Sequence, residues 1–160
     1  MVNSAIATGN YFNLQSGDSA LHCLPTQFIA GKMMFVRAIV LGLELDLVNP
    51  SLKPLLGLDK KYDFCAMVPM QLQNSIKELR NIKTLIVGGA HVSNSILEKI
   101  KNSSTKIYAT YGMTETITHI AVKQLNCKND DTFSEVKKLH FNLLPNITIS
   151  QDSRNCLVID

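Results

Sequence analysis

The stretch TLIVGGA, residues 84–90, decides the fold class. Apolar and β-branched residues fill positions 84–87, and the pair Gly88-Gly89 then ends the run. Such a run is typical of a strand that is buried on both faces, as strands are in a parallel sheet covered by helices. We therefore expect an α/β fold in which Gly88-Gly89 forms the turn after one parallel strand.

Helix-like and strand-like segments alternate around this stretch. Strand patterns occupy residues 19–23, 44–48, 62–67 and 106–110, and helical patterns occupy residues 2–12, 29–43, 69–79 and 93–101. Pro69 suits the first turn of one helix, and Ser93 is a candidate N-cap for another. This repeated β-α order predicts a mainly parallel sheet with covering helices.

The pattern changes in the C-terminal quarter of the chain. Short strand-like segments separated by polar turns cover residues 117–123, 138–143, 148–150 and 156–159. We therefore expect a sheet part over residues 1–123 and the start of a small β-rich part over residues 124–160. Because the chain stops within the last apolar strand pattern, we expect it to be one fragment of a longer domain.

Composition excludes several classes of protein. The chain has 160 residues, 46% of them hydrophobic, and a net charge of +3 without a basic run, so it can bury a core but does not indicate a nucleic-acid partner. Its most apolar window, 28–48, carries four charged residues, which argues against membrane insertion. Without a secretory signal or closely spaced cysteines (Cys23, Cys65, Cys127 and Cys156), a cytoplasmic protein with reduced thiols is expected.

The second informative stretch is YATYGMTET, residues 108–116. In a parallel sheet it would follow a neighbouring strand and lie beside Gly88-Gly89, at the edge where ligands bind. Glycines allow a flat ring to approach the backbone, Tyr111 offers a stacking face, Thr114 a hydroxyl for a phosphate, and Glu115 an oxygen for Mg²⁺. Each stretch also has a structural interpretation: a tight turn at Gly88-Gly89, and a short helical turn capped by Thr114.

Together, LIVGGA and YATYGMTET resemble two signature motifs of the adenylate-forming acyl-CoA synthetases. The segments HCLPTQFIAGKMMFVRAIVLGL (22–43) and AMVPMQLQNSI (66–76) are similar to the acyl-pocket region of that family. These surroundings most resemble the branch that activates o-succinylbenzoate in menaquinone synthesis. The resemblance covers most of residues 1–123.

The resemblance implies a two-step reaction: a carboxylate attacks the α-phosphate of ATP, and coenzyme A then displaces AMP from the acyl-adenylate. It further implies that different motif residues contact different parts of the nucleotide. Gly88, Gly89 and Ala90 would line the adenine and acyl pocket, Tyr111, Gly112 and Met113 would flank the nucleotide, Thr114 would contact the α-phosphate, and Glu115 would bind Mg²⁺. It also implies the central part of a ligase more than twice this length, so the isolated chain is expected to be inactive.

The acid-binding residues are expected on the helical segment 29–43. Arg37 lies six residues after Gly31, and a guanidinium there could hold the second carboxylate of a dicarboxylate such as o-succinylbenzoate. The alternative is an ordinary surface or capping arginine. Phe28 stands where relatives carry an aromatic residue or, often in the menaquinone branch, histidine. For His91 and His119 we expect structural roles ahead of a role in the pocket.

Two other functions remain open from the sequence. One is adenylation of another acyl, aryl or amino acid. The other is a nucleotide-binding or interaction module that has lost the reaction. The partners expected are a small carboxylic acid, ATP and coenzyme A, with homo-oligomerisation possible.

Overall fold

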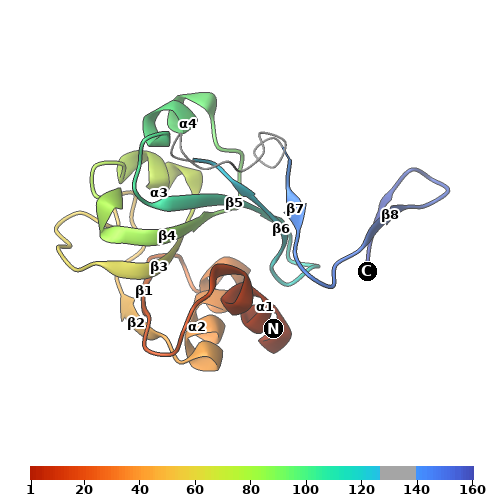
Figure 1. Ribbon diagram of the computed structural model, residues 1–160, viewed down its shortest axis with the longest axis horizontal. Coiled ribbons are helices and arrows are strands. Elements are labelled where there is room, and N and C mark those ends of the chain that lie inside the picture. Colours follow the sequence, from red (N-terminus) through yellow and green to blue (C-terminus); the bar gives the residue numbers. More distant parts are fainter. Residues whose placement is uncertain (127–139) are drawn as a thin grey trace.

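A seven-stranded sheet forms the main body of the computed structural model, which describes residues 1–126 and 140–160 (Figure 1). The strand order is β2-β1-β3-β4-β5-β6-β7. The first five are parallel to one another, and β6 and β7 are antiparallel to their neighbours. The predicted mainly parallel sheet is therefore confirmed. The strands are β1 (Ser19–His22), β2 (Glu44–Leu47), β3 (Tyr62–Met67), β4 (Ile82–Val87), β5 (Lys106–Gly112), β6 (His119–Gln124) and β7 (Asn142–Leu143).

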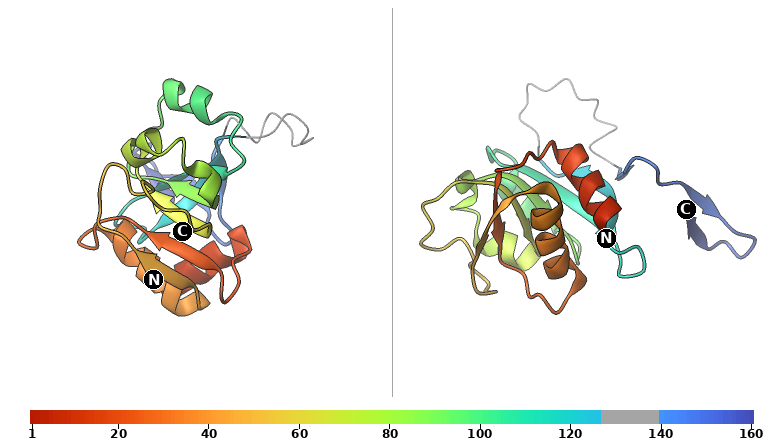
Figure 2. Two further views of the ribbon diagram at one scale, coloured as in Figure 1. Left: turned by 90° about the vertical axis from the view of Figure 1, so that its left-hand side faces the viewer. Right: turned by 90° about the horizontal axis from the view of Figure 1, so that it is seen from below.

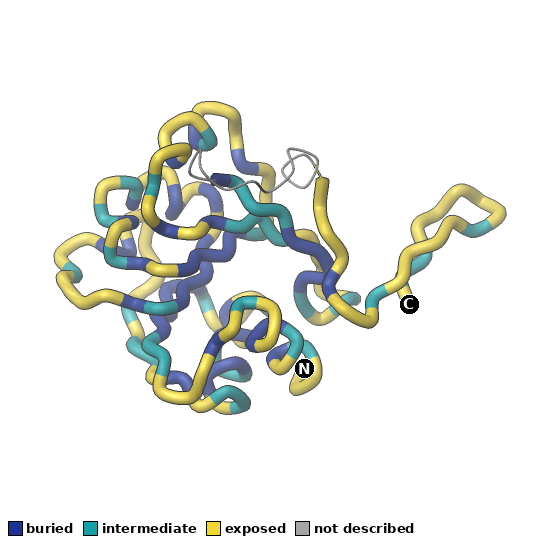
Figure 3. Tube along the Cα trace, viewed as in Figure 1, coloured by how far each residue is buried: buried dark blue, intermediate teal, exposed yellow. Residues whose placement is uncertain are grey.

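Helices cover both faces of this sheet, as Figures 1 and 2 show. The helices α1 (Val2–Phe12) and α2 (Ile29–Leu41) lie on one face, and α3 (Pro69–Asn74) and α4 (Asn94–Ile100) lie on the other. Each face has its own apolar layer. Phe64 and Met34 belong to the α1/α2 layer, and Leu85 and Ile107 belong to the α3/α4 layer. The buried segments of the trace accordingly concentrate in the central strands (Figure 3).

Two predicted boundaries were wrong. The helix that starts at Pro69 ends at Asn74 instead of residue 79, because the Asn74 side chain donates to the Met70 carbonyl and the chain leaves helical geometry at Ser75; a 3-10 turn, Leu79–Asn81, follows. Strand β5 continues to Gly112, beyond the predicted end at residue 110, because β6 pairs with this extension.

The C-terminal part only partly follows the expectation. Strands β8 (Ile149–Gln151) and β9 (Leu157–Ile159) do form a separate two-stranded antiparallel sheet, which projects from the main body (Figures 1 and 2). By contrast, β6 and β7 join the main sheet. Cys127 and the first residues of the predicted strand 138–143 lie outside the described residues. No helix in the two described ranges is long and apolar enough to cross a membrane.

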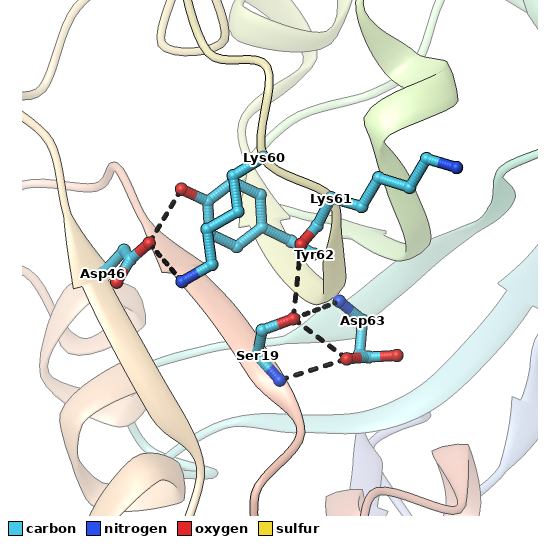
Figure 4. A network of polar contacts seen from close by, with 6 residues as sticks. All are labelled: Ser19, Asp46, Lys60, Lys61, Tyr62 and Asp63. Atoms are coloured by element: carbon cyan, nitrogen blue, oxygen red, sulfur yellow. Dashed lines mark hydrogen bonds and ion pairs between the residues drawn. The ribbon is translucent and has the colours of Figure 1, made fainter.

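A polar network holds the amino-terminal ends of the central strands together (Figure 4). The Asp63 carboxylate of β3 accepts hydrogen bonds from the backbone N–H and hydroxyl of Ser19 on β1, at 3.1 and 2.9 Å. On β2, Asp46 accepts from Lys60 at 2.8 Å and from the Tyr62 hydroxyl at 2.9 Å. Burial, together with the bond to this carboxylate, raises the pKa of Tyr62 to about 12. These contacts link β1 to β3 and β2 to β3.

Candidate active site

A cavity of about 280 Å³ opens at the carboxyl ends of β3, β4 and β5. Its volume is near the lower end of the range of about 300–1,000 Å³ that is typical of small-molecule sites. Three regions supply its walls: the ends of these strands, the turn between β5 and β6, and helix α2. The lining residues are Leu24, Ile29, Ala30, Met33, Arg37, Ala66, Met67, Val68, Ile86, Gly88, Gly89, Thr110, Gly112, Met113, Thr114, Ile117, Thr118 and His119.

The glycine pair after β4 forms one wall of the cavity. A Cβ atom on Gly88 would lie 2.5 Å from the Thr110 hydroxyl, so the two strand ends meet closely only with glycine at that position. Gly89 has φ +83°, a left-handed conformation that glycine adopts readily. Ala90 is exposed and is not among the lining residues. The pair therefore leaves bare backbone at the cavity wall.

Strand alternation explains why Tyr111 is not in the cavity. Successive side chains of a strand point to opposite faces, so Thr110 and Tyr111 cannot share one wall. Thr110 lines the cavity and donates to the Val87 carbonyl at 3.2 Å. The Tyr111 ring is 42% exposed, and its centroid is 6.0 Å from that of Phe141. The tyrosine is thus at the rim but outside the cavity.

The turn between β5 and β6 is internally braced. The Thr116 hydroxyl accepts from the Met113 N–H at 3.0 Å and also lies within hydrogen-bond distance of the Met113 and Thr118 carbonyls. Between them, Ile117 adopts φ +68°, and the Thr118 N–H reaches the Thr116 carbonyl at 2.7 Å. This is a γ-turn centred on a β-branched residue, which is a rare and strained conformation. A single turn does follow Thr114, whose carbonyl accepts from the Ile117 N–H at 3.0 Å, but it does not continue into a helix.

Arg37 contributes a buried charge to the cavity wall. Arg37 is only 2% exposed, so the alternative of a surface arginine is excluded. Burial lowers the pKa of the guanidinium to about 10, which leaves it protonated at neutral pH. Nη2 donates to the Thr118 hydroxyl at 2.9 Å, and Nη1 contacts the Met34 sulfur at 3.8 Å. Within residues 1–126 and 140–160, no carboxylate pairs with it, and Nε has no hydrogen-bond partner.

His119, the first residue of β6, also lines the cavity, although the sequence favoured a structural role. Burial, and then the charge of Arg37, lower the pKa of His119 to about 3, so the imidazole is neutral. Its Nδ1 lies 3.3 Å from the Thr118 hydroxyl, and its Nε2 is buried without a partner in the described part of the chain. The other three histidines are not among the lining residues.

Thr114 and Glu115 stand at the mouth of the cavity. Both are exposed in the β5–β6 turn, and Thr114 lines the cavity whereas Glu115 does not. In the described ranges, no three His, Cys, Asp or Glu side chains gather into a metal cluster. Mg²⁺ bound to a nucleotide takes one or two protein carboxylates and completes its shell with phosphates and water. The single exposed carboxylate of Glu115 fits that ligand pattern.

Phe28 and Gly31 do not line the cavity, although both were expected to contact the acid. Phe28 is the N-cap residue of α2 and is 59% exposed. Gly31 is buried, and a Cβ atom there would lie 2.2 Å from the Pro25 carbonyl oxygen, so this glycine serves close packing at the helix start. Their neighbours Ile29, Ala30 and Met33 form the helix wall instead.

Comparison with known proteins supports the fold. A crystal structure of an AMP-forming acyl-CoA synthetase/AMP-acid ligase II-like protein from Dyadobacter fermentans superposes with a TM-score of 0.86 and 38% identity, over 99% of this chain and 45% of that one. The o-succinylbenzoate coenzyme A synthetase of Bacillus subtilis, solved with ATP and magnesium, gives a TM-score of 0.79 at 20% identity, over 98% and 33% of the two chains.

Curated sequences point to the same group of enzymes. The 2-succinylbenzoate–CoA ligase of Oceanobacillus iheyensis is 24% identical over 73% of this chain, and that of Staphylococcus aureus MW2 is 27% identical over 71%. The matched region spans about a quarter of the length of either relative, 26% and 24%. The sequence profile of the AMP-binding enzymes matches residues 1–147, and the chain therefore belongs to the AMP-binding enzyme family.

Proposed function

We propose that this chain is the central part of an ATP-dependent acid–CoA ligase, with o-succinylbenzoate as its acid. In that reaction the acid first becomes an acyl-adenylate, and the thiol of coenzyme A then releases AMP and forms the thioester. A carboxylate is a poor acyl donor until one of its oxygens belongs to a good leaving group, and adenylation supplies that group. The isolated 160-residue chain would lack turnover.

The observation that carries the choice of acid is the buried Arg37. A guanidinium that is 2% exposed and has no carboxylate partner among the described residues favours an anionic ligand. The remaining wall is mainly apolar, with Leu24, Ile29 and Met33 facing the same cavity. An acid with an apolar body and a second carboxylate matches this combination, and o-succinylbenzoate has both.

The nucleotide would lie against the strand ends. Gly88 and Gly89 would let adenine approach the backbone, with Ala90 beside them and Tyr111 on its other side, and Gly112 and Met113 would shape the turn. Thr114 would contact the α-phosphate, and Glu115 would hold Mg²⁺. Bound there, the metal would neutralise phosphate charge that develops during adenylation.

Thioester formation by the complete ligase, with ATP, coenzyme A and a panel of acids, tests this proposal. We expect Arg37→Ala to lower kcat/KM at least about tenfold more for o-succinylbenzoate than for benzoate, because only the diacid loses a charged contact. Equal losses would remove Arg37 from acid recognition. The absence of thioester with every acid would overturn the ligase function itself.

A further inference from the structure

Arg37, Thr118 and His119 form a chain of polar contacts in the cavity wall. Arg37 comes from α2. Thr118 is the last residue of the β5–β6 turn, 81 residues further along the chain, and His119 is the first residue of β6. All three line the cavity. A polar contact between such distant segments, at a wall that is otherwise mainly apolar, calls for a functional explanation.

The hydrogen positions in this chain follow from its contacts. The Thr118 oxygen accepts a hydrogen bond from the guanidinium, and the other side-chain contact of its hydroxyl in the described ranges is His119 Nδ1. We therefore assign the hydroxyl proton to the bond with Nδ1, which places the imidazole proton on Nε2. The chain thus runs from the guanidinium through Thr118 to an imidazole that accepts at Nδ1.

A side chain that orients an arginine is commonly a carboxylate, but a carboxylate would also cancel its charge. Here, Thr118 supplies an acceptor without a charge. His119 Nδ1 in turn accepts the hydrogen bond of the Thr118 hydroxyl, and the imidazole is also uncharged. Only two of the five guanidinium N–H groups have acceptors in the described ranges, one on Thr118 and one on the Met34 sulfur. The guanidinium is therefore oriented and still unneutralised.

We propose that Thr118 and His119 are positioning residues that hold Arg37 at the cavity wall without pairing its charge, so that the distal carboxylate of the acid becomes its counter-ion. This inference rests on the proposed acid-binding function of the cavity and adds the residues that create the preference for diacids. It predicts that position 119 controls the preference through charge rather than through size.

An isosteric pair of variants tests the role of charge. His119→Asn keeps an acceptor for the Thr118 hydroxyl, whereas His119→Asp places a negative charge at the same point. In the complete ligase, we expect the kcat/KM ratio of o-succinylbenzoate to benzoate to fall at least about tenfold in His119→Asp and to stay within about threefold in His119→Asn. His91→Asp, an exposed position outside the cavity, is the matched control, and its ratio should equal that of the wild type.

Substitution of Thr118 tests the orienting contact. Thr118→Val should lower the same ratio, chiefly through KM for the diacid, and Thr118→Ser should restore it. Nitrogen NMR of the imidazole adds a direct readout, because loss of the hydroxyl should remove the preference for the Nε2–H form. Equal ratios in His119→Asp and His119→Asn, or an unchanged ratio in Thr118→Val, would overturn the proposal.

Equilibrium binding separates this inference from the ligase function. Calorimetry with o-succinylbenzoate and benzoate in the absence of ATP requires only the cavity. Binding that prefers the diacid and loses this preference in His119→Asp, in a protein without thioester formation, would overturn the ligase function and support the inference. Thioester formation that is equally insensitive to both substitutions would overturn the inference alone.

Discussion

At the scale of single residues, Gly112 at the end of β5 has no room for a side chain. A Cβ atom at this position would lie 2.3 Å from the Thr118 carbonyl oxygen and 2.6 Å from the His119 Cα atom. Both neighbours are backbone atoms, one in the turn and one in the facing strand, so neither can rotate away. The register shift between Tyr111 and Gly112 occurs at the same point. Glycine at 112 therefore fixes how closely Thr118 and His119 approach the cavity.

We expect Gly112→Ala to lower the free energy of unfolding by about 1–3 kcal/mol, because the facing strand must shift to admit the methyl group. Urea unfolding followed by circular dichroism measures this loss. Gly57→Ala is the control: its φ of +78° costs about 1 kcal/mol, but no atom lies within 4 Å of the added Cβ. A smaller loss in Gly112→Ala than in Gly57→Ala would contradict the crowding argument.

The sequence predicted only some of the residues at this site. Gly88 and Gly89 line the cavity, because a glycine pair directly after a parallel strand lies at the sheet edge where ligands bind. For His119 the sequence favoured a structural role. Its place at the cavity depends on the antiparallel pairing of β6 with β5, which no local pattern encodes. The burial of Arg37 was likewise not readable from the sequence. It depends on contact between α2 and a segment 81 residues away.

At the scale of elements, Asp63 joins β1 and β3. Burial alone would raise its pKa, but hydrogen bonds from the Ser19 N–H and hydroxyl, and then Lys83 at 3.3 Å, outweigh burial and lower the pKa. A carboxyl whose pKa is lower in the folded state stabilises the fold fully above its unfolded pKa, about 3.9. This contribution is lost as the pH falls through the lower folded value.

Asp63→Asn should therefore lower the free energy of unfolding by about 1 kcal/mol at pH 7, and the difference from the wild type should shrink below about pH 4. Chemical unfolding at a series of pH values measures both effects. Asp59→Asn provides the control, because Asp59 is exposed and makes no hydrogen bond or ion pair in the described ranges. A difference that stays constant from pH 7 to pH 2 would exclude the ionised carboxylate as its cause.

Elements with a definite end in the sequence were predicted well. The α1 helix matches residues 2–12, a mixed but helix-compatible segment that a polar turn follows, and β3 matches residues 62–67, an apolar strand pattern that ends before Pro69. The errors fell on α3 and on the end of β5. There the boundary depends on a side-chain contact from Asn74 and on pairing with β6, neither of which is encoded by local periodicity.

At the scale of the whole molecule, the sheet is shared by two apolar layers. Phe64 of β3 is fully buried in the layer beneath α1 and α2, and Ile107 of β5 is fully buried in the layer beneath α3 and α4. Loss of either layer would expose one face of the same strands to water. The two layers should therefore unfold together.

We expect Phe64→Leu and Ile107→Val each to lower the free energy of unfolding by about 1 kcal/mol, and both to keep a single unfolding transition. Far-ultraviolet circular dichroism reports the backbone, and tyrosine fluorescence reports packing. Ile39→Val, on a side chain that is 80% exposed, should leave the midpoint unchanged. Separate midpoints for the two probes would show that the layers unfold independently.

The short hairpin between β5 and β6 has a kinetic consequence. It carries Thr114 and Glu115 on one arm and Thr118 and His119 on the other, and Thr116 ties the two arms together. A displacement that moves one arm must drag the other. If one arm contacts the nucleotide and the other the acid as proposed, binding of either substrate affects binding of the other through this loop. Substitutions in it would then shift the Michaelis constants for both substrates in concert, and evolving a new acid preference there would risk impaired nucleotide use.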